Sequence, residues 1–283
     1  MSTSLWAGVD LGGTGTRIVL ADGTGESIAG RTVPTESLAA SGTDGLADLI
    51  GSLVPEQGTL MGVGVGASGP VDLRTGLIHN ADTLPAFSGL DVAGDLQRRL
   101  SVPTWIDNDA VAASLAEAAF GAATGTSSVL CVTLGTGVGA AVIQHGTPVR
   151  SADGQHPEGG HLPVPGSGHP CYCGLAQCWE QVASRRALDR LQSVADPRSV
   201  WSYYAEDVAW GLIALITLYR PECVVVGGSV AQHWEFLEHP LRRALMQSRE
   251  CSPALRVLPS SLGERGGALG ASLLPQHEIG WHR

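Results

Sequence analysis

The chain has 283 residues, of which 43% are hydrophobic and only 16% are charged. This composition predicts an extensive packed core, and the length favours two lobes over one. The formal net charge is −10 with no basic cluster to offset it, so nucleic acid and anionic membranes are not expected partners. The chain contains 17 arginines and no lysine. Chemistry that needs lysine, such as a Walker-type phosphate loop or a Schiff base, is therefore excluded.

The sequence carries no signal of secretion or membrane insertion. The N-terminus has no basic segment followed by an apolar one, and no apolar stretch is long enough to span a bilayer. The six cysteines do not indicate a secreted disulfide framework, because Cys131 and Cys223 lie in apolar, strand-like runs. We therefore expect a cytoplasmic protein.

A β-hairpin is predicted over residues 5–22, with a tight glycine-rich turn at residues 11–15. Residues 128–147 repeat this design around a second glycine-rich turn at residues 134–139. Aligned on the turns, Asp10 of the first hairpin matches Thr133 of the second. The chain is therefore predicted to contain two related halves, each opening with a strand, a turn of phosphate-binding size and a second strand.

Strands alternate with helices through the rest of the chain. Strands are predicted at residues 61–66, 104–106 and 223–226, and helices at residues 92–100, 110–119, 205–219, 230–246 and 266–274. The strand at 104–106 leads into Asp107-Asn108-Asp109, and the strand at 223–226 leads into Gly227-Gly228. This alternation predicts an α/β fold.

The two glycine-rich turns are candidate phosphate loops, because glycine lets several backbone amides approach an anion closely. Two turns in equivalent positions are predicted to face each other across a cleft and to hold one nucleotide. Mg²⁺ and backbone dipoles would neutralise the phosphates in a chain without lysine. Asp10, beside the first turn, is predicted to face that Mg²⁺ through water, with capping of the turn as the alternative.

Three polar residues, Asp107, Asn108 and Asp109, end one strand and begin a helix. The carboxyl ends of strands are where open α/β sheets place ligands. An aspartate there can accept a proton from a hydroxyl that attacks phosphorus, and we assign this role to Asp109 and hydroxyl binding to Asn108. One of the three is also expected to serve as the helix N-cap.

The densest cluster of metal-binding residue types lies at residues 161–178, where His161 precedes Cys171, Cys173 and Cys178. Thiolate and imidazole ligands from one short, turn-rich segment are typical of tetrahedral zinc, and four protein ligands would make the zinc structural. His156 and His169 compete with His161 for the fourth position. Glu158 and Glu180 flank the cluster, so a metal there would also order polar groups beside a pocket.

Several motifs together resemble the ROK family of bacterial sugar kinases, and they span nearly the whole chain in order. They are Asp-Leu-Gly-Gly-Thr at 10–14, Gly-Ala-Ser-Gly-Pro-Val at 66–71, Asn-Asp-Ala at 108–110, Leu-Gly-Thr-Gly-Val-Gly at 134–139, Glu-Gly-Gly-His at 158–161, Cys-Tyr-Cys-Gly at 171–174, Cys-Trp-Glu at 178–180 and Val-Val-Gly-Gly at 225–228. The resemblance implies a two-lobed, actin-like fold of the ribonuclease-H type with duplicated βββαβα halves. The implied lobes are residues 1–108 with 266–283, and residues 109–265.

The resemblance also implies roles for individual residues. Asp109 matches the family's general base, and His161 with the three cysteines matches its zinc site. The implied sugar-binding residues are Asn80, Asn108, Asp109, Glu158, His161 and Glu180. The implied nucleotide-binding residues are Asp10, Gly12, Gly13, Thr14, Gly135, Thr136, Gly137, Gly227 and Gly228.

The implied activity is ATP-dependent phosphorylation of a hexose, with the 6-hydroxyl of glucose as the first expectation. The alternatives are a kinase for fructose, mannose, an aminosugar or a specialised sugar, polyphosphate as the donor, or a non-catalytic sugar sensor on the same fold. Repressors of the family carry an N-terminal helix-turn-helix domain, and because the hairpin here begins at Leu5, such a domain is not expected. Family members are often dimers, so a homodimer is expected.

Overall fold

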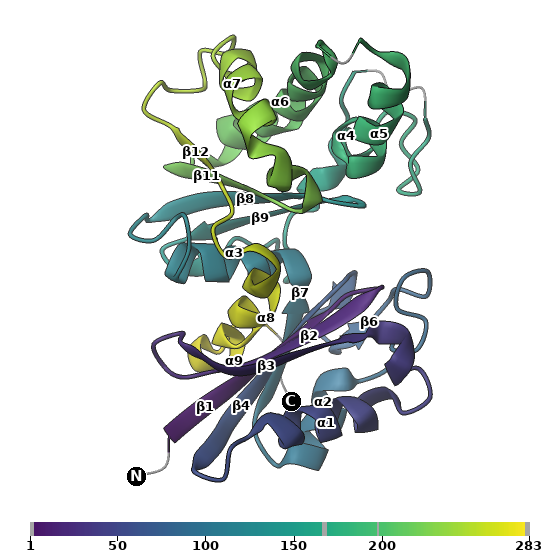
Figure 1. Ribbon diagram of the computed structural model, residues 1–283, viewed down its shortest axis with the longest axis vertical. Coiled ribbons are helices and arrows are strands. Elements are labelled where there is room, and N and C mark those ends of the chain that lie inside the picture. Colours follow the sequence, from purple (N-terminus) through teal and green to yellow (C-terminus); the bar gives the residue numbers. More distant parts are fainter. Residues whose placement is uncertain (1–2, 166–168, 197, 281–283) are drawn as a thin grey trace. The chain divides into compact units, whose positions relative to one another are not determined.

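The computed structural model describes residues 3–165, 169–196 and 198–280, which form two compact units. Unit 1 comprises residues 1–120, 150–156 and 264–283, and unit 2 comprises residues 121–149 and 157–263. Figure 1 shows that each unit is built on its own β-sheet covered by helices. Within the described ranges, no helix combines the length and the apolar character needed to cross a membrane.

Unit 1 is built on a five-stranded sheet in the order β3-β2-β1-β4-β7. Its strands are β1 (Thr3–Leu11), β2 (Gly15–Ala21), β3 (Ser27–Pro34), β4 (Gly58–Ala67) and β7 (Thr104–Asn108). β1, β4 and β7 are parallel, whereas β2 and β3 return antiparallel as a meander. A small hairpin of β5 (Val71–Asp72) and β6 (Leu77–Ile78) follows β4.

Helices cover both faces of the unit 1 sheet. Its helices are the 3₁₀ helix η1 (Thr35–Leu38), α1 (Gly42–Leu53), α2 (Val92–Leu100), α3 (Asp109–Ala119), α8 (Gly266–Ala271) and α9 (Leu273–His277). α1 and α2 lie on one face, and α8 and α9 lie on the other with α3 packed on α8 (Figure 1).

The glycines of β1 and β4 explain how α8 approaches the sheet so closely. A Cβ on Gly8 would lie 1.8 Å from the carbonyl oxygen of Ala268, and a Cβ on Gly64 would lie 1.8 Å from that of Ala271. The alternate residues Val63 and Val65 point to the opposite face and are fully buried in the core under α1 and α2. The predicted glycine-rich strand is therefore confirmed, with glycines against one layer and valines in the other.

Unit 2 repeats the sheet topology, in the order β10-β9-β8-β11-β12. Its strands are β8 (Ser128–Leu134), β9 (Val138–Gln144), β10 (Thr147–Pro148), β11 (Cys223–Gly227) and β12 (Arg256–Pro259). β8, β11 and β12 are parallel, and β9 and β10 return antiparallel, as in unit 1. The predicted duplication of the two halves is thus confirmed at the level of strand order.

The helices of unit 2 enclose its hydrophobic core together with the sheet. They are α4 (Trp179–Ala183), α5 (Arg185–Val194), α6 (Val200–Tyr219) and α7 (Trp234–Leu245), with the 3₁₀ helices η2 (Gly159–His161) and η3 (Ser229–His233). A further 3₁₀ helix, η4 (Gly263–Arg265), lies where the chain returns to unit 1. The core packs Trp179 and Tyr204 against the valines of β8 and β11, all with side chains almost wholly buried.

The two units differ from the lobes predicted from the sequence, which divided the chain after residue 108. α3 groups with unit 1 because it packs on α8, where a Cβ on Gly270 would lie 1.7 Å from the carbonyl oxygen of Ala112. Residues 150–156 also group with unit 1, because Arg150 pairs with the buried Asp107 and Gln155 Nε2 donates to the carbonyl of Val71.

Candidate active site and metal centre

The parallel strands of unit 1 bring three polar positions to one edge of the sheet. Leu11 at the end of β1 pairs with Ala67 of β4, which in turn pairs with Asn108 at the end of β7. Asp10, Ser68 and Asp109 lie at or directly beside these strand ends. Because this is the edge at which α/β sheets bind ligands, it is the candidate catalytic edge of unit 1.

Asp109 is the first residue of α3 and its carboxylate is held by two donors. Ser68 Oγ donates to Asp109 Oδ2 at 2.8 Å, and the backbone N–H of Ala110 donates to Oδ1 at 2.8 Å. Burial raises the pKa of Asp109, whereas these two hydrogen bonds stabilise the charged form and oppose the rise. The carboxylate is thus oriented and less acidic than in water, which are the properties required of a general base.

The other two residues of the Asp107-Asn108-Asp109 triplet have structural contacts. Asn108 is the N-cap of α3, since its Oδ1 accepts a hydrogen bond from Ala110 N at 2.8 Å. The expected capping role therefore falls on Asn108. Asp107 is 1% exposed and forms an ion pair with Arg150, while its Oδ1 accepts from Asn108 N at 2.7 Å.

Asp10 lies beside the first glycine-rich turn and close to Asp109. The pKa of Asp10 is raised to about 6, first by burial and then by the negative charge of Asp109, while Arg17 at 3.6 Å lowers it. Two carboxylates that repel each other and are partly removed from water form a natural site for a cation. The turn itself is closed by Gly12 N donating to Gly15 O at 3.2 Å, and it leaves Gly13 and Thr14 exposed.

The side-chain amide of Asn80 forms hydrogen bonds with the backbone of neighbouring segments. Its Nδ2 donates to the carbonyls of Ser68 and Gly69 at 3.2 and 2.9 Å, and its Oδ1 accepts from Thr83 N at 3.0 Å. The side chain therefore holds the segment that presents Ser68 to Asp109.

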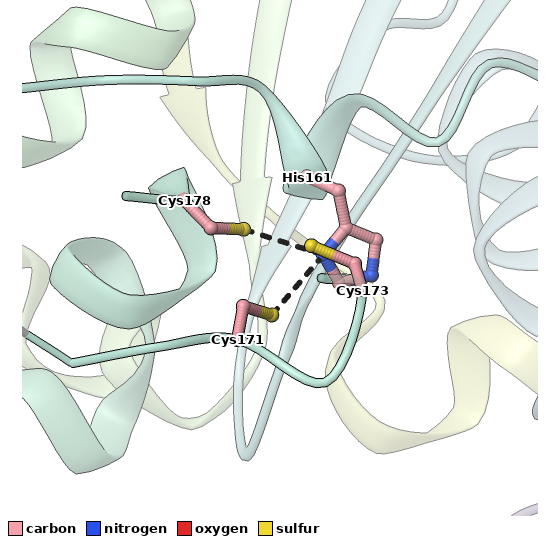
Figure 2. A group of neighbouring side chains, drawn as sticks. All are labelled: His161, Cys171, Cys173 and Cys178. Atoms are coloured by element: carbon pink, nitrogen blue, oxygen red, sulfur yellow. Dashed lines mark hydrogen bonds between the residues drawn. The ribbon is translucent and has the colours of Figure 1, made fainter. Parts of the chain in front are cut away.

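In unit 2, His161, Cys171, Cys173 and Cys178 converge (Figure 2), and one ligand atom from each lies within 4.8 Å of the others. His161 Nδ1 is 3.3 Å from Cys178 Sγ and 3.7 Å from Cys171 Sγ. Tetrahedral zinc with bonds of 2.0–2.3 Å separates its ligand atoms by about 3.5–4 Å, so this donor set fits the metal. His161, and not His156 or His169, is the histidine that joins the cysteines in this cluster.

The orientation of His161 distinguishes its two ring nitrogens. Nδ1 faces the sulfur atoms, and Nε2 lies 3.0 Å from the hydroxyl oxygen of the exposed Tyr172. A hydrogen bond at the outer nitrogen fixes the ring and leaves Nδ1 as the metal-facing atom. His156, by contrast, is buried in unit 1, where burial lowers its pKa to about 4.

The second glycine-rich turn, at residues 134–139 in unit 2, lies against Glu180. The turn is closed by Gly135 N donating to Gly137 O at 3.0 Å, and Glu180 Oε2 accepts from Val138 N at 3.2 Å. Glu180 is 8% exposed, whereas Glu158 is exposed. Gly228 follows β11 with φ of 82° and lies against β8, since a Cβ there would come within 2.4 Å of Leu134 O.

The predicted residues therefore fall into two groups. Unit 1 gathers Asp10, Asn80, Asn108 and Asp109, and unit 2 gathers the second turn, Gly227-Gly228, Glu180 and the cysteine cluster. Sequence reasoning missed Ser68, Arg150 and Tyr172 as members of these groups. Ser68 and Tyr172 lie within recognised motifs, whereas Arg150 carried no signal because its partner is 43 residues away.

Comparison with known proteins identifies the family of the chain. The sequence profile of the ROK family matches residues 6–278. The glucokinase of Thermotoga maritima is 27% identical over 311 residues, covering 96% of this chain and 98% of the relative.

Solved structures of the family share the fold. The ROK hexokinase of Thermus thermophilus superposes with a TM-score of 0.81 at 31% identity, covering 97% of this chain and 99% of that one. A ROK glucokinase of Streptomyces griseus, solved in complex with glucose and AMPPNP, gives a TM-score of 0.78 at 28% identity over 95% and 98% of the two chains. The chain has the actin-like fold of these kinases and belongs to the ROK family.

Proposed function

We propose that this ROK sugar kinase transfers the γ-phosphoryl group of ATP to the 6-hydroxyl of a hexose, with glucose as the first candidate. The observation that carries the proposal is the pair of carboxylates at the catalytic edge of unit 1, with Asp10 beside the phosphate turn and Asp109 on a fixed helix N-terminus. The glucose and AMPPNP complex of the Streptomyces griseus relative supports the choice of substrates.

Asp109 serves as the general base in this proposal. As the sugar oxygen attacks the γ-phosphorus and the bond to ADP breaks, the hydroxyl proton passes to the Asp109 carboxylate. The donors from Ser68 and Ala110 orient that carboxylate and favour its ionised form against the effect of burial. Asn80 and the Asn108 cap fix the backbone on both sides of it, so the base is positioned before the sugar binds.

The sugar-binding residues of unit 1 are Asn108 and Asp109, and those of unit 2 are Glu158, His161 and Glu180. Carboxylates and an imidazole can accept and donate to the hydroxyls of a carbohydrate. The turns at residues 12–14 and 135–137 bind the phosphates, and Gly227-Gly228 contacts the adenosine. Asn80 acts through the Ser68–Gly69 segment that its amide holds.

Two metals complete the proposal. Mg²⁺ at Asp10 would neutralise charge on the β- and γ-phosphates. Zinc at His161 and the three cysteines would be structural, because four protein ligands close its shell. A homodimer stays a prediction from the family resemblance.

The test is a coupled assay of ADP release from ATP over a hexose panel that includes glucose, fructose, mannose and glucosamine. We expect sugar-dependent ADP release, fastest with glucose, and no release above background with Asp109→Ala as the control for contaminating kinases. A parallel series replaces ATP with polyphosphate and measures the sugar phosphate formed, because this donor leaves a shortened polyphosphate and no ADP. Calorimetric binding of sugar without turnover on any donor would instead identify a sugar sensor and refute the proposal.

A further inference from the structure

The short helix α4 lies directly between the cysteine cluster and the second phosphate turn. It starts at Trp179, next to Cys178, and the backbone N–H of Trp179 donates to Leu162 O at 2.8 Å. Both attachments at its start therefore come from the cluster segments that contain Cys178 and His161. Five residues make too few helical hydrogen bonds to hold a helix in place, so its position depends on such tertiary anchors.

The Glu180 carboxylate lies between the cysteine cluster and the second phosphate turn. Its Oε2 accepts from Val138 N at 3.2 Å, while its Oε1 lies 3.9 Å from Cys171 Sγ. The fit at the turn is tight, because a Cβ on Gly137 would come within 2.6 Å of Glu180 Oε2. The buried carboxylate therefore lies directly against the backbone of the turn.

The far end of α4 holds the other side of the same turn. After Ser184, the N-cap of α5, the backbone N–H of Arg185 donates to Gly135 O at 2.7 Å. The second phosphate turn is therefore attached on both sides, Gly135 and Val138, to the α4 segment. A displacement of α4 at its cluster end would be transmitted to both attachments.

We infer that metal binding by the four-residue cluster positions the second phosphate turn through α4 and Glu180, so that metal content controls binding of the phosphate donor as well as of the sugar. Glu180 acts here as a positioning residue for the turn. The inference rests on the proposed function, in which this turn binds the donor phosphates. It differs from a purely sugar-ordering role for the metal, which would leave the turn unchanged.

The experiment measures the turn directly in the absence of sugar. Hydrogen exchange of the peptide covering residues 133–139 and the Kd of AMPPNP are compared in zinc-loaded and zinc-stripped protein. We expect zinc removal to accelerate exchange at the turn and to weaken AMPPNP about tenfold, as for loss of one hydrogen bond to a charged acceptor. Exchange of the α6 core, residues 208–216, serves as the control that unit 2 remains folded.

Glu180→Ala, kept loaded with zinc, provides a second arm that does not depend on surviving metal removal. We expect it to reproduce both changes in part, and zinc removal from this variant to have a smaller further effect on the turn than in the wild type, because only the Arg185–Gly135 attachment is left to transmit it. Gln181→Ala, on the same helix, is the matched control and should leave the turn and the Kd unchanged.

The outcomes separate the inference from the proposed function. Unchanged exchange at the turn in both zinc-stripped protein and Glu180→Ala would overturn the inference, whether or not the enzyme phosphorylates sugars. Failure of zinc-loaded wild-type protein to bind AMPPNP would instead contradict the proposed function, while a changed exchange pattern would still support the coupling between cluster and turn.

Discussion

Removal of Arg150 is expected to lower the free energy of unfolding, because the buried Asp107 carboxylate loses its ion-pair partner. Asp107 is 1% exposed, and its ion pair with Arg150 joins β7 to the 150–156 segment. Arg150→Ala leaves a carboxylate that must stay charged without its partner or take up a proton. Asp107 directly precedes the Asn108-Asp109 pair, so the same change should loosen the start of α3.

The size of the effect follows from the cost of protonating that carboxylate. With an unperturbed pKa of about 3.9, neutralising an aspartate costs about 4 kcal/mol at pH 7 and about 1.5 kcal/mol at pH 5. These protonation costs are upper limits on the loss of stability. The cost at pH 7 agrees with the roughly 3–5 kcal/mol lost when one partner of a buried ion pair is removed. Burial already raises the pKa of Asp107, and loss of Arg150 raises it further, so the stability deficit grows as pH increases.

The assay is urea unfolding at pH 5 and pH 7, with hydrogen exchange of β7 as a local readout. We expect Arg150→Ala to lose about 3 kcal/mol at pH 7 and less than half of that at pH 5. Asp107→Asn combined with Arg150→Ala should recover part of the loss, because no buried charge remains. Arg99→Ala, which breaks an exposed pair with Asp44, is the control and should cost at most about 1 kcal/mol. A small loss that is equal at both pH values would refute the reasoning.

Two further predictions concern the turn and the base. Ser68→Ala removes a donor to Asp109, which raises the pKa of the base. The acidic limb of the pH–rate profile should therefore move up by about one pH unit. Ser114→Ala, on the helix α3 that begins with Asp109, is the control and should leave the limb unchanged. An unshifted limb would show that the hydroxyl does not tune Asp109. Gly137→Ala should lower the unfolding free energy by about 1–3 kcal/mol and raise the KM for ATP, because its Cβ meets Glu180. Gly135→Ala should have a smaller effect, because a Cβ there would lie no nearer than 3.9 Å to any heavy atom. Equal thermal midpoints for these two variants would contradict the packing argument.

The sequence predicted the repeated elements well because local patterns define them. The two hairpins and the helix at 92–100 appear as expected, and the strand predicted at 104–106 is present but extends to Asn108. Other helices were not predicted, among them α1, α4 and α5. α4 has only five residues, and its position is set by the cysteine cluster and Glu180, which are tertiary contacts.

The candidate site was predictable in residue type more than in arrangement. The Cys–His spacing predicted a metal-binding segment, and the structure brings its three cysteines together with His161 and not with its competitors. The sequence did not predict that the Asn80 amide would bond to the backbone of residues 68, 69 and 83, whereas its role in sugar binding stays a prediction. The Asp107–Arg150 pair depends on a contact between distant segments and has no local signature.

The role of Asp109 is tested most directly by measuring kcat and sugar affinity together for Asp109→Asn, which keeps the size and loses the charge of the base. We expect kcat to fall by about 10²–10⁴-fold while the calorimetric Kd for the sugar changes only a few-fold. Turnover within a few-fold of the wild-type rate would show that Asp109 does not accept the proton.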